Sequence, residues 1–586
     1  MEEIQNTLKK TIVELYSVEM DVVLTPAPEN TGCDFATNVA MLLAKTLKKN
    51  PMEIAEELMR GLGETDLEIK IARPGFLNFK LSNKKLLKNI DKFEKDFTKN
   101  ISSDAYSGQT VICEFSDPNP FKVLHVGHLY TSIVGEAISR VIEYAGGKVV
   151  RANFGGDIGL HVARNMYGML RKIKEIPTDL TPEKVADLLA ECYVFGTRAD
   201  ENDAEAHAEI VKLNKMIFEI AEAGEGADYS GDPERARVAE LYFWGRKNSY
   251  QYFENFYKRL QVKFDKYYPE SMVAKTGLET VRRELKNGVY EMSDGAVVYR
   301  GDKHGLHTRV FINNKGLPTY EAKDTGLIFE KYKDYHFDKS IIITGNDIIE
   351  YMKVVLSAIS QYAPELSSKT LHITHGQVKL PGNEKMSSRK GNFLRAIDVI
   401  EMVREAMEKS SDERVLMGAL KYAFAKYKIG GDIIFDIKES VSMTGNSGPY
   451  LQYSAVRAKK ILGKIFSSQI SGDLNKVEDE AEALISETDS AEKEAKYLAN
   501  ISIYERNLMK KIIQYPDVLK ETVRELLPNK ICTYLYELAQ EFSRFYEHVQ
   551  VAGSEFELER GKIILVYLKI LTHGLNLLGI EVPEQM

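Results

Sequence analysis

The stretch PNPFKVLHVGH, residues 118–128, places two histidines three positions apart at the start of a predicted helix. A strand-like run at residues 111–115 precedes it. A helical pattern follows, in which apolar residues recur every four positions from Leu129 to Val141. Two glycines end this helix, and residues 148–152 form a second strand-like run. The stretch therefore lies in a β–α–β unit of a parallel sheet.

Ligands of parallel sheets bind beyond the carboxyl ends of the strands, against helix N-termini. His125 and His128 stand at that end and add imidazole donors to the free N–H groups of the helix. Gly127 lies between them and allows a flat base or ribose to approach the backbone. The stretch predicts a phosphate and adenosine site. A pair of capping or core histidines is the alternative, and this stretch alone leaves both open.

A second stretch, KLPGNEKMSSRKGNF at residues 379–393, is typical of a flexible loop because it contains a proline and two glycines. Lys385, Ser387 and Ser388 lie at its centre. Lysines and hydroxyls on such a loop suit a pyrophosphate that is held during reaction and then released. An exposed basic turn is the alternative. The occurrence of both HVGH and KMSS in one α/β region is much harder to explain by chance than the occurrence of either stretch alone.

Composition describes an ordinary globular protein of several domains, with 586 residues, 44% hydrophobic and 28% charged. The net charge of -8 means that a nucleic-acid partner would need local basic patches. The 4 cysteines are far apart and form no CxxC pair, which argues against a structural metal and for a reducing compartment. We find no signal-peptide pattern and no run of about 18 apolar residues. The expectation is a cytoplasmic protein without a membrane partner.

The chain divides into three predicted domains. Residues 1–100 form a lysine-punctuated α+β module, with helices at 4–16, 38–48 and after Pro51, and strand-like residues at 69–81. Residues 105–438 alternate strand and helix patterns, which predicts a parallel sheet, and a helix-rich insertion interrupts them at about 164–288. Residues 439–586 are almost wholly helical.

The HVGH and KMSS stretches together resemble the two signatures of class I aminoacyl-tRNA synthetases, and the chain is similar within that class to the arginyl-tRNA synthetases. The resemblance covers nearly the whole chain. It rests on GCDFATNVAMLLAKTLKKNP, ARPGFLNFKLS, EFSDPNPFKVLHVGHL, VVRANFGGDIGLHVARNMYG, LPTYEAKDTGL, GPYLQYSAVRA and the ending HGLNLLGIEVPEQM. It implies an α/β Rossmann-type catalytic domain with a helical insertion, an N-terminal α+β added domain and a C-terminal all-α anticodon-binding domain of the DALR type.

The resemblance also implies roles for individual residues. The catalytic set would be His125, His128, Lys122 and Lys385. The ATP-binding set would be Gly127, His128, Asp347, Val378, Lys385, Ser387 and Ser388. The arginine-binding set would be Glu114, Asn119, Tyr320 and Asp324. Carboxylates and neutral acceptors suit a guanidinium with its five donors. The alternatives are a surface acid for Asp324 and core packing for Tyr320, and the sequence leaves open which carboxylate faces which end of arginine.

The chain departs from the family pattern at two places. Tyr130 stands where most relatives have arginine, and GNDIIEY at residues 345–351 stands where many have GADHHGY. Ile348 and Ile349 thus replace two histidines, which puts a ligand contact from these positions in doubt. Many relatives also have a degraded KMSK loop and compensate with a lysine before the first motif, whereas this chain has KMSS as well as Lys122.

The implied reaction joins L-arginine to ATP, giving arginyl-adenylate and pyrophosphate, and then transfers arginine to the 3′ end of tRNA(Arg) for protein synthesis. ATP would act with Mg²⁺, without a structural metal, and the chain would be a monomer. The N-terminal module would contact the tRNA elbow, and the helical domain the anticodon. Candidate contacts are Lys459, Lys460, Lys464, Lys510, Lys511, Tyr450, Tyr453, Phe545 and Tyr546, with a core role as the alternative for each aromatic.

Two rival functions differ in class. A small nucleotidyltransferase also has an H-x-G-H motif, but a single α/β domain does not account for 586 residues with a helical C-terminal region. A synthetase-like RNA-binding or regulatory protein would not need intact HVGH and KMSS. Arginine-dependent exchange of ATP with pyrophosphate separates the three.

Overall fold

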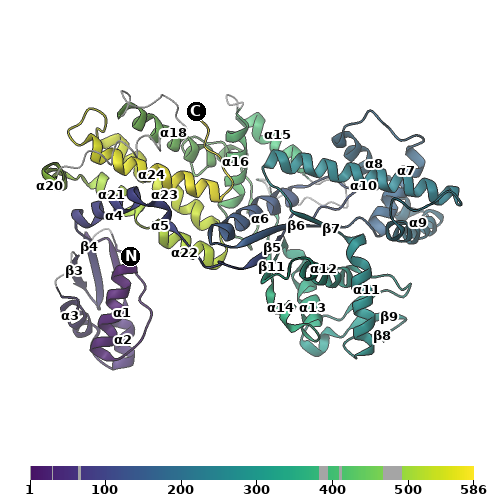
Figure 1. Ribbon diagram of the computed structural model, residues 1–586, viewed down its shortest axis with the longest axis horizontal. Helices are drawn as coiled ribbons and strands as arrows, with labels where there is room; N and C mark the ends of the chain where they lie inside the picture. The colour runs from purple at the N-terminus through teal and green to yellow at the C-terminus, as the bar shows by residue number, and fades with distance from the viewer. Residues whose placement is uncertain are drawn as a thin grey trace.

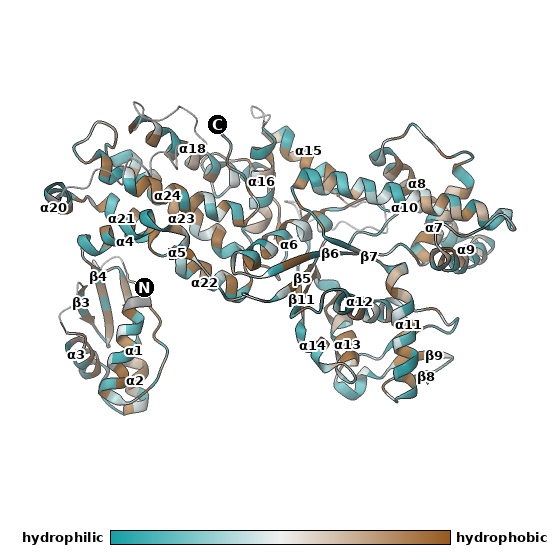
Figure 2. Cartoon of the chain, viewed as in Figure 1, coloured by the Kyte–Doolittle hydropathy of each residue, from teal (hydrophilic) through white to brown (hydrophobic). Residues whose placement is uncertain are grey.

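The computed structural model describes residues 2–28, 31–63, 67–379, 381, 394–407, 412–465 and 491–586. Three parts follow one another in Figure 1: an N-terminal lobe, a central α/β region and a C-terminal helical region that lies beside the lobe and the centre. Most helices carry both hydrophilic and hydrophobic residues, as Figure 2 shows, which fits helices with one buried face. None of the helices in the described part of the chain is long and apolar enough to cross a membrane.

The central sheet contains five parallel strands in the order β12-β11-β5-β6-β7. These are β5 (Thr110–Glu114), β6 (Lys148–Gly155), β7 (Lys266–Pro269), β11 (Lys339–Gly345) and β12 (Thr370–His375). The first strand of this sheet, β5, lies in its middle. The strands that follow extend first to one edge, through β6 and β7, and then to the other, through β11 and β12, so the strand order reverses between β5 and β11. Such a switch point is where α/β sheets of this type bind ligands. The predicted Rossmann-type fold is confirmed.

Each face of the sheet has its own core. Val111 and Cys113 of β5 belong to one core together with Leu129 and Ile133 of α6 (Val126–Tyr144). Ile112 belongs to the opposite core, because successive side chains of a strand alternate between faces. That second core is covered by α11 (Glu270–Lys286), α12 (Tyr320–Tyr335), α13 (Ile349–Ser360) and α14 (Pro364–Lys369).

The region predicted as a helical insertion contains four helices with a separate hydrophobic core: α7 (Leu160–Lys172), α8 (Pro182–Asn202), α9 (Ala204–Ala223) and α10 (Pro233–Leu260). Residues 266–269, inside the predicted range, instead form β7 at the edge of the main sheet. A small antiparallel sheet that the pattern did not predict follows, with β8 (Glu291–Ser293), β9 (Ala296–Tyr299) and β10 (Arg309–Ile312). Two 3₁₀ turns complete this region, η2 (Gly301–His304) and η3 (Asn346–Ile348).

The N-terminal lobe has an antiparallel sheet in the order β1-β2-β4-β3. Its elements are α1 (Glu2–Tyr16), β1 (Thr25–Pro26), β2 (Phe35–Thr37), α2 (Val39–Leu47), α3 (Pro51–Gly61), β3 (Leu67–Ala72) and β4 (Phe76–Leu81), followed by α4 (Asn83–Lys95) and α5 (Phe97–Ile101). The strand-like run at 69–81 is thus a hairpin, because Pro74 and Gly75 interrupt it. Arg506 of the C-terminal region holds the lobe by donating to Asp34 Oδ2 at 2.6 Å and to the Leu81 carbonyl at 2.8 Å.

The C-terminal region is helical, as the apolar spacing predicted. Its helices are α18 (Gly448–Ile465), α20 (Ala491–Asn500), α21 (Ile503–Ile512), α22 (Tyr515–Glu525), α23 (Asn529–His548) and α24 (Glu557–Leu577). The link from the sheet contains β13 (Val378–Lys379), α15 (Ala396–Ala406), α16 (Glu413–Ala425), β14 (Ile433–Ile434) and α17 (Ile437–Ser440). The residues of α6, α16, α18 and α24 share one continuous core. The catalytic sheet and the C-terminal helices therefore support each other directly.

Candidate active site

The two histidines of HVGH form the N-terminal cap of α6. His125 Nδ1 accepts a hydrogen bond from the Gly127 amide at 3.0 Å, and His128 Nδ1 accepts one from the His125 amide at 3.1 Å. The rings stack with centroids 3.7 Å apart. Because each Nδ1 accepts, the proton of each neutral ring is on Nε2. The capping role and a ligand-binding role are thus compatible: Nδ1 serves the helix, and Nε2–H is the donor that suits a phosphate oxygen.

The electrostatics of the site keep both rings neutral near pH 7. Burial, with a smaller contribution from the Lys122 charge, lowers the pKa of His125 to about 4. Burial and the neighbouring His125 hold the pKa of His128 well below its usual range. The rings therefore act as neutral hydrogen-bond donors, and positive charge comes from Lys122 and the helix N-terminus.

Lys122 and Asp347 approach the histidines from different elements. Lys122 is partly buried, and its ammonium lies 4.8 Å from the centroid of the Tyr193 ring on α8. Asp347 is exposed just after β11, and its charge opposes the lowering of the His125 pKa. The two sides of the switch point, after β5 and after β11, thus meet at His125.

The segment that follows KMSS pairs with HVGH. The Val126 amide donates to the Leu394 carbonyl at 2.9 Å, and the Ala396 amide donates to the Leu124 carbonyl at 2.9 Å. These bonds form an antiparallel bridge between His125 and Arg395. Lys385, Ser387 and Ser388 lie outside the described residues, and Val378 lies in β13, paired with β14. The residue directly after the KMSS stretch is therefore hydrogen-bonded beside the first histidine.

The predicted acidic pocket begins at the end of β5. Glu114 is buried there and accepts from Lys331 Nζ at 2.6 Å, with both side chains at most 4% exposed. Lys331 lies on α12, two turns after Asp324, so the two residues share one face of that helix. Glu114 thus already has a counter-ion within the protein. The sequence pattern could not predict this pair, because the two residues are 217 positions apart in the chain.

Lys331→Met is expected to lower the free energy of unfolding by about 3–5 kcal/mol, because it leaves Glu114 buried without a counter-ion. Urea denaturation followed by circular dichroism measures this loss. Lys353→Met is the matched control, since Lys353 pairs with Glu350 on the surface and both are 55% exposed, which predicts a loss below about 1 kcal/mol. Equal losses for the two variants would contradict the importance of the buried pair.

The other predicted pocket residues lie around the same strand ends. Asn119 Oδ1 accepts from the Gly156 amide at 2.8 Å, which orients the Asn119 side chain and leaves its NH₂ group as a donor. A Cβ on Gly156 would approach that oxygen to 2.5 Å and displace the Asn119 side chain from this position. Tyr320 is the first residue of α12 and is 57% exposed, so it is not a core residue.

Asp324 is partly buried and accepts from the hydroxyl of Tyr351. Burial raises the pKa of its carboxyl to about 7, against the Tyr351 hydrogen bond, and the nearby charges of Glu114 and Glu270 add to the rise. A carboxyl in this state ionises readily when a cation binds. Asp324 is therefore not a simple surface acid.

Three polar residues near the pocket escaped the sequence reasoning. Glu270 begins α11 and forms a buried ion pair with Lys323. The ring of His161 lies 2.8 Å from the Gly156 carbonyl, and burial lowers its pKa to about 3. Asp117 accepts from the Phe154 amide at 2.8 Å. Asp117 had a visible signal, since it lies between Glu114 and HVGH and directly precedes Pro118.

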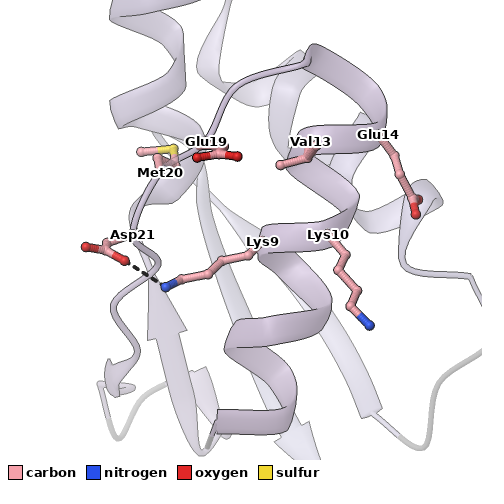
Figure 3. Close-up of a pocket in the computed structure, with 7 residues that line it drawn as sticks. All are labelled: Lys9, Lys10, Val13, Glu14, Glu19, Met20 and Asp21. Carbon is pink, nitrogen blue, oxygen red and sulfur yellow. Dashed lines mark hydrogen bonds and ion pairs between the residues drawn. The ribbon is translucent and has the colours of Figure 1, made fainter.

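A depression of about 590 Å³ lies apart from this site, in the N-terminal lobe (Figure 3). Its lining residues are Lys9, Lys10, Val13, Glu14, Glu19, Met20 and Asp21. Lys9 donates to Asp21 at 2.7 Å, so part of its charge is already compensated. Among the described residues, no group of three His, Cys, Asp or Glu side chains could hold a metal ion.

Family models match all three parts of the chain. Residues 95–419 match "tRNA synthetases class I (R), catalytic domain", residues 451–586 match "DALR anticodon binding domain", and residues 2–81 match "Arginyl tRNA synthetase N terminal domain". The fold and the HVGH site define a class I aminoacyl-tRNA synthetase. The chain belongs to the arginyl-tRNA synthetase family of that class, which confirms the resemblance seen in the sequence.

Individual relatives agree with the family assignment. The arginine–tRNA ligase of Treponema denticola is 28% identical, with 100% of both chains covered. That of Borreliella burgdorferi is 29% identical, covering 87% of this chain and 85% of the relative. The fold is similar to the solved structures of the Thermus thermophilus and Plasmodium falciparum arginyl-tRNA synthetases, each with a TM-score of 0.75 and 21% identity. This chain is covered completely in both, and the matched chains to 100% and 99%.

Proposed function

We propose that the chain is an arginine–tRNA ligase that activates L-arginine with ATP and transfers it to tRNA(Arg). The observation that carries the proposal is the hydrogen-bonded pairing of the HVGH segment with residues 394–396, together with the neighbouring acids Glu114, Asp117 and Asp324 at the end of β5 and on α12. Donors that suit phosphate oxygens, on His125 and His128, and carboxyl groups that suit a cationic substrate thus lie at the same switch point of the sheet. The family assignment and the names of the relatives support the same reaction.

In the first step a carboxylate oxygen of arginine attacks the α-phosphorus of ATP, and the bond from that phosphorus to the bridging oxygen of pyrophosphate breaks. His125 and His128 donate from Nε2 to phosphate oxygens, while Lys122 balances negative charge. Lys385, Ser387 and Ser388 hold the leaving pyrophosphate, and Gly127, Asp347 and Val378 surround the adenosine. We propose that Mg²⁺ arrives bound to the ATP phosphates. Positioning and charge stabilisation account for catalysis.

In the second step the 3′-terminal hydroxyl of the tRNA attacks the acyl carbon, and AMP leaves. Neither step needs a nucleophile from the protein. The chain would act in the cytoplasm as a monomer. Production of pyrophosphate that depends on arginine, ATP and the purified protein tests the proposal, and its absence with and without tRNA would contradict it.

The anticodon contact is proposed for one face of α18. Arg457 lies between two tyrosine rings, 4.8 Å from the centroid of Tyr453 and 4.9 Å from that of Tyr546. Lys460 and Lys464 are exposed and continue this face at helical spacing. Arg457 and Tyr453 are partly buried and Tyr546 is exposed, and a cation between such aromatic rings suits phosphates and unpaired bases.

The remaining predicted tRNA contacts have partners within the protein. Phe545 is fully buried, so the core alternative holds for it, and Lys459 is also buried. Lys510 pairs with Asp34 and Lys511 with Glu537. The Tyr450 hydroxyl lies 3.2 Å from the Ser543 hydroxyl. We therefore keep only the Arg457 face as the candidate surface.

Arg457→Ala is expected to raise the KM for tRNA by roughly 10- to 150-fold, the equivalent of one charge-assisted hydrogen bond. The KM for arginine should change much less, because α18 is not part of the acidic pocket. Arg524→Ala is the matched control, since Arg524 is 71% exposed and pairs with Glu525 on α22. If the KM for tRNA of Arg457→Ala is as low as that of the control, this face of α18 does not bind tRNA.

A further inference from the structure

The charges around the amino-acid pocket do not balance. Three carboxylates have cationic partners: Glu114 with Lys331 at 2.6 Å, Glu270 with Lys323, and Glu321 with Arg309 at 3.4 Å. Two others, Asp117 and Asp324, form no ion pair with any described residue of the chain. Among these residues the protein thus supplies two more carboxyl groups than cationic groups.

Asp117 is held firmly at the pocket. It lies between β5 and α6, and its backbone has φ 51°, a left-handed conformation that aspartate tolerates better than most residues. Its Oδ1 accepts from the Phe154 amide on β6, which fixes the carboxylate and leaves Oδ2 available to a ligand. Its charged neighbours are Glu114 on β5, and Lys331 and Asp324 on α12.

We propose that Asp117 is a further substrate-binding residue, whose carboxylate receives the α-ammonium of arginine while Asp324 receives the guanidinium. This inference rests on the proposed function. Arginine carries two cationic groups, which is the number of uncompensated carboxylates. Lys331 serves as the internal counter-ion of Glu114 and so leaves Asp117 and Asp324 for the substrate.

The assignment of the two ends follows from the reaction. The arginine carboxylate must reach the α-phosphate beside HVGH, and the α-ammonium is bonded to the carbon next to that carboxylate. Asp117 lies on the same β5–α6 segment as HVGH, eight residues before His125, whereas Asp324 lies on α12. The guanidinium, at the far end of the side chain, therefore belongs to Asp324.

Arginine binding should release protons from this pocket. Burial and the charge of Glu114 raise the pKa of Asp117, and the pKa of Asp324 is raised to about 7. The other groups that face them are Lys331, Glu270, Glu321 and the hydroxyls of Tyr351 and Tyr257. The two cationic groups of arginine bind the ionised carboxylates, so affinity for arginine rises with pH through this range and falls as the carboxylates become protonated.

The test compares ligands that lack one cationic group each. 5-Guanidinopentanoate lacks the α-ammonium, and citrulline has a neutral urea in place of the guanidinium. Calorimetry gives dissociation constants for arginine and both analogues with the full-length protein and its variants. Asp117→Asn keeps the acceptor for the Phe154 amide and removes only the charge. Asp334→Asn is the matched control, because Asp334 lies on α12 and pairs with Lys266.

We expect Asp117→Asn to weaken arginine binding by roughly 30-fold or more. The preference for arginine over 5-guanidinopentanoate should collapse in this variant, and the preference over citrulline should persist. Asp324→Asn should show the reverse, and Asp334→Asn should keep both preferences. If Asp117→Asn keeps the preference over 5-guanidinopentanoate, or loses only that over citrulline, the inference is wrong. Failure of the unmodified protein to bind arginine would instead contradict the proposed function.

Discussion

Asp324→Ala should weaken arginine use, measured as kcat/KM, by roughly 30- to 3000-fold. The removed carboxylate is partly buried, has no cationic partner among the described residues and has a pKa raised to about 7. A guanidinium that loses this partner remains desolvated in the pocket, which accounts for the size of the effect. Lysine cannot replace arginine well in the intact site, because one compact ammonium does not match a site built for a planar fork.

Steady-state measurements with arginine and with ATP varied separately test this prediction. The KM for ATP should change much less than that for arginine, since the HVGH segment does not include Asp324. Asp334→Asn again provides the control for a lost acid on α12. Equal losses for both substrates, or no loss for arginine, would show that the guanidinium binds elsewhere.

His128→Ala should reduce turnover by roughly 100- to 1000-fold, the typical effect of a lost donor to a developing oxyanion. The loss should appear in kcat, because the Nε2–H group acts on charge that grows during attack on the α-phosphate. His128 Nδ1 also accepts from the His125 amide, so the variant loses a helix cap worth about 1 kcal/mol. That cost is small for a domain of this size.

Single-turnover rates of adenylate formation measure this effect, with thermal unfolding as the check on folding. His128→Asn restores an acceptor for the cap without the Nε2 donor geometry, so it should regain stability but not rate. His207→Ala on the exposed surface of the insertion is the control. Near-normal turnover of a folded His128→Ala protein would remove His128 from the catalytic set.

The HVGH segment shows which parts of the fold were predictable. Its strand, glycine turn and four-residue apolar spacing are local signals, and the β–α–β unit forms where they predict it. The hairpin of β3 and β4 and the edge strand β7 were less clear, because short strands depend on their neighbours more than on their own residues. The predicted insertion consequently included a strand of the main sheet.

The residue types of the candidate site could be predicted from the sequence, but the ion pairs that these residues form could not. Glu114 stood out as an acid at a strand end, yet its partner Lys331 lies 217 residues away and is brought close only by tertiary folding. Glu270, which the sequence pattern did not identify, likewise meets its partner Lys323 only through tertiary folding. The sequence identified the carboxylates of Glu114 and Asp324, whereas the structure adds Asp117 and shows which carboxylates have no ion pair. The roles of His125, Lys122, Asn119, Tyr320 and the KMSS residues stay predictions.

The most direct test of the central claim is charging of unfractionated tRNA by the purified full-length protein, with each of the 20 amino acids labelled in turn and ATP present. We expect acid-precipitable label with arginine alone, lost when ATP is omitted and accompanied by release of AMP and pyrophosphate. Charging with a different amino acid, or no charging with arginine by folded protein, would contradict the proposed arginine–tRNA ligase activity.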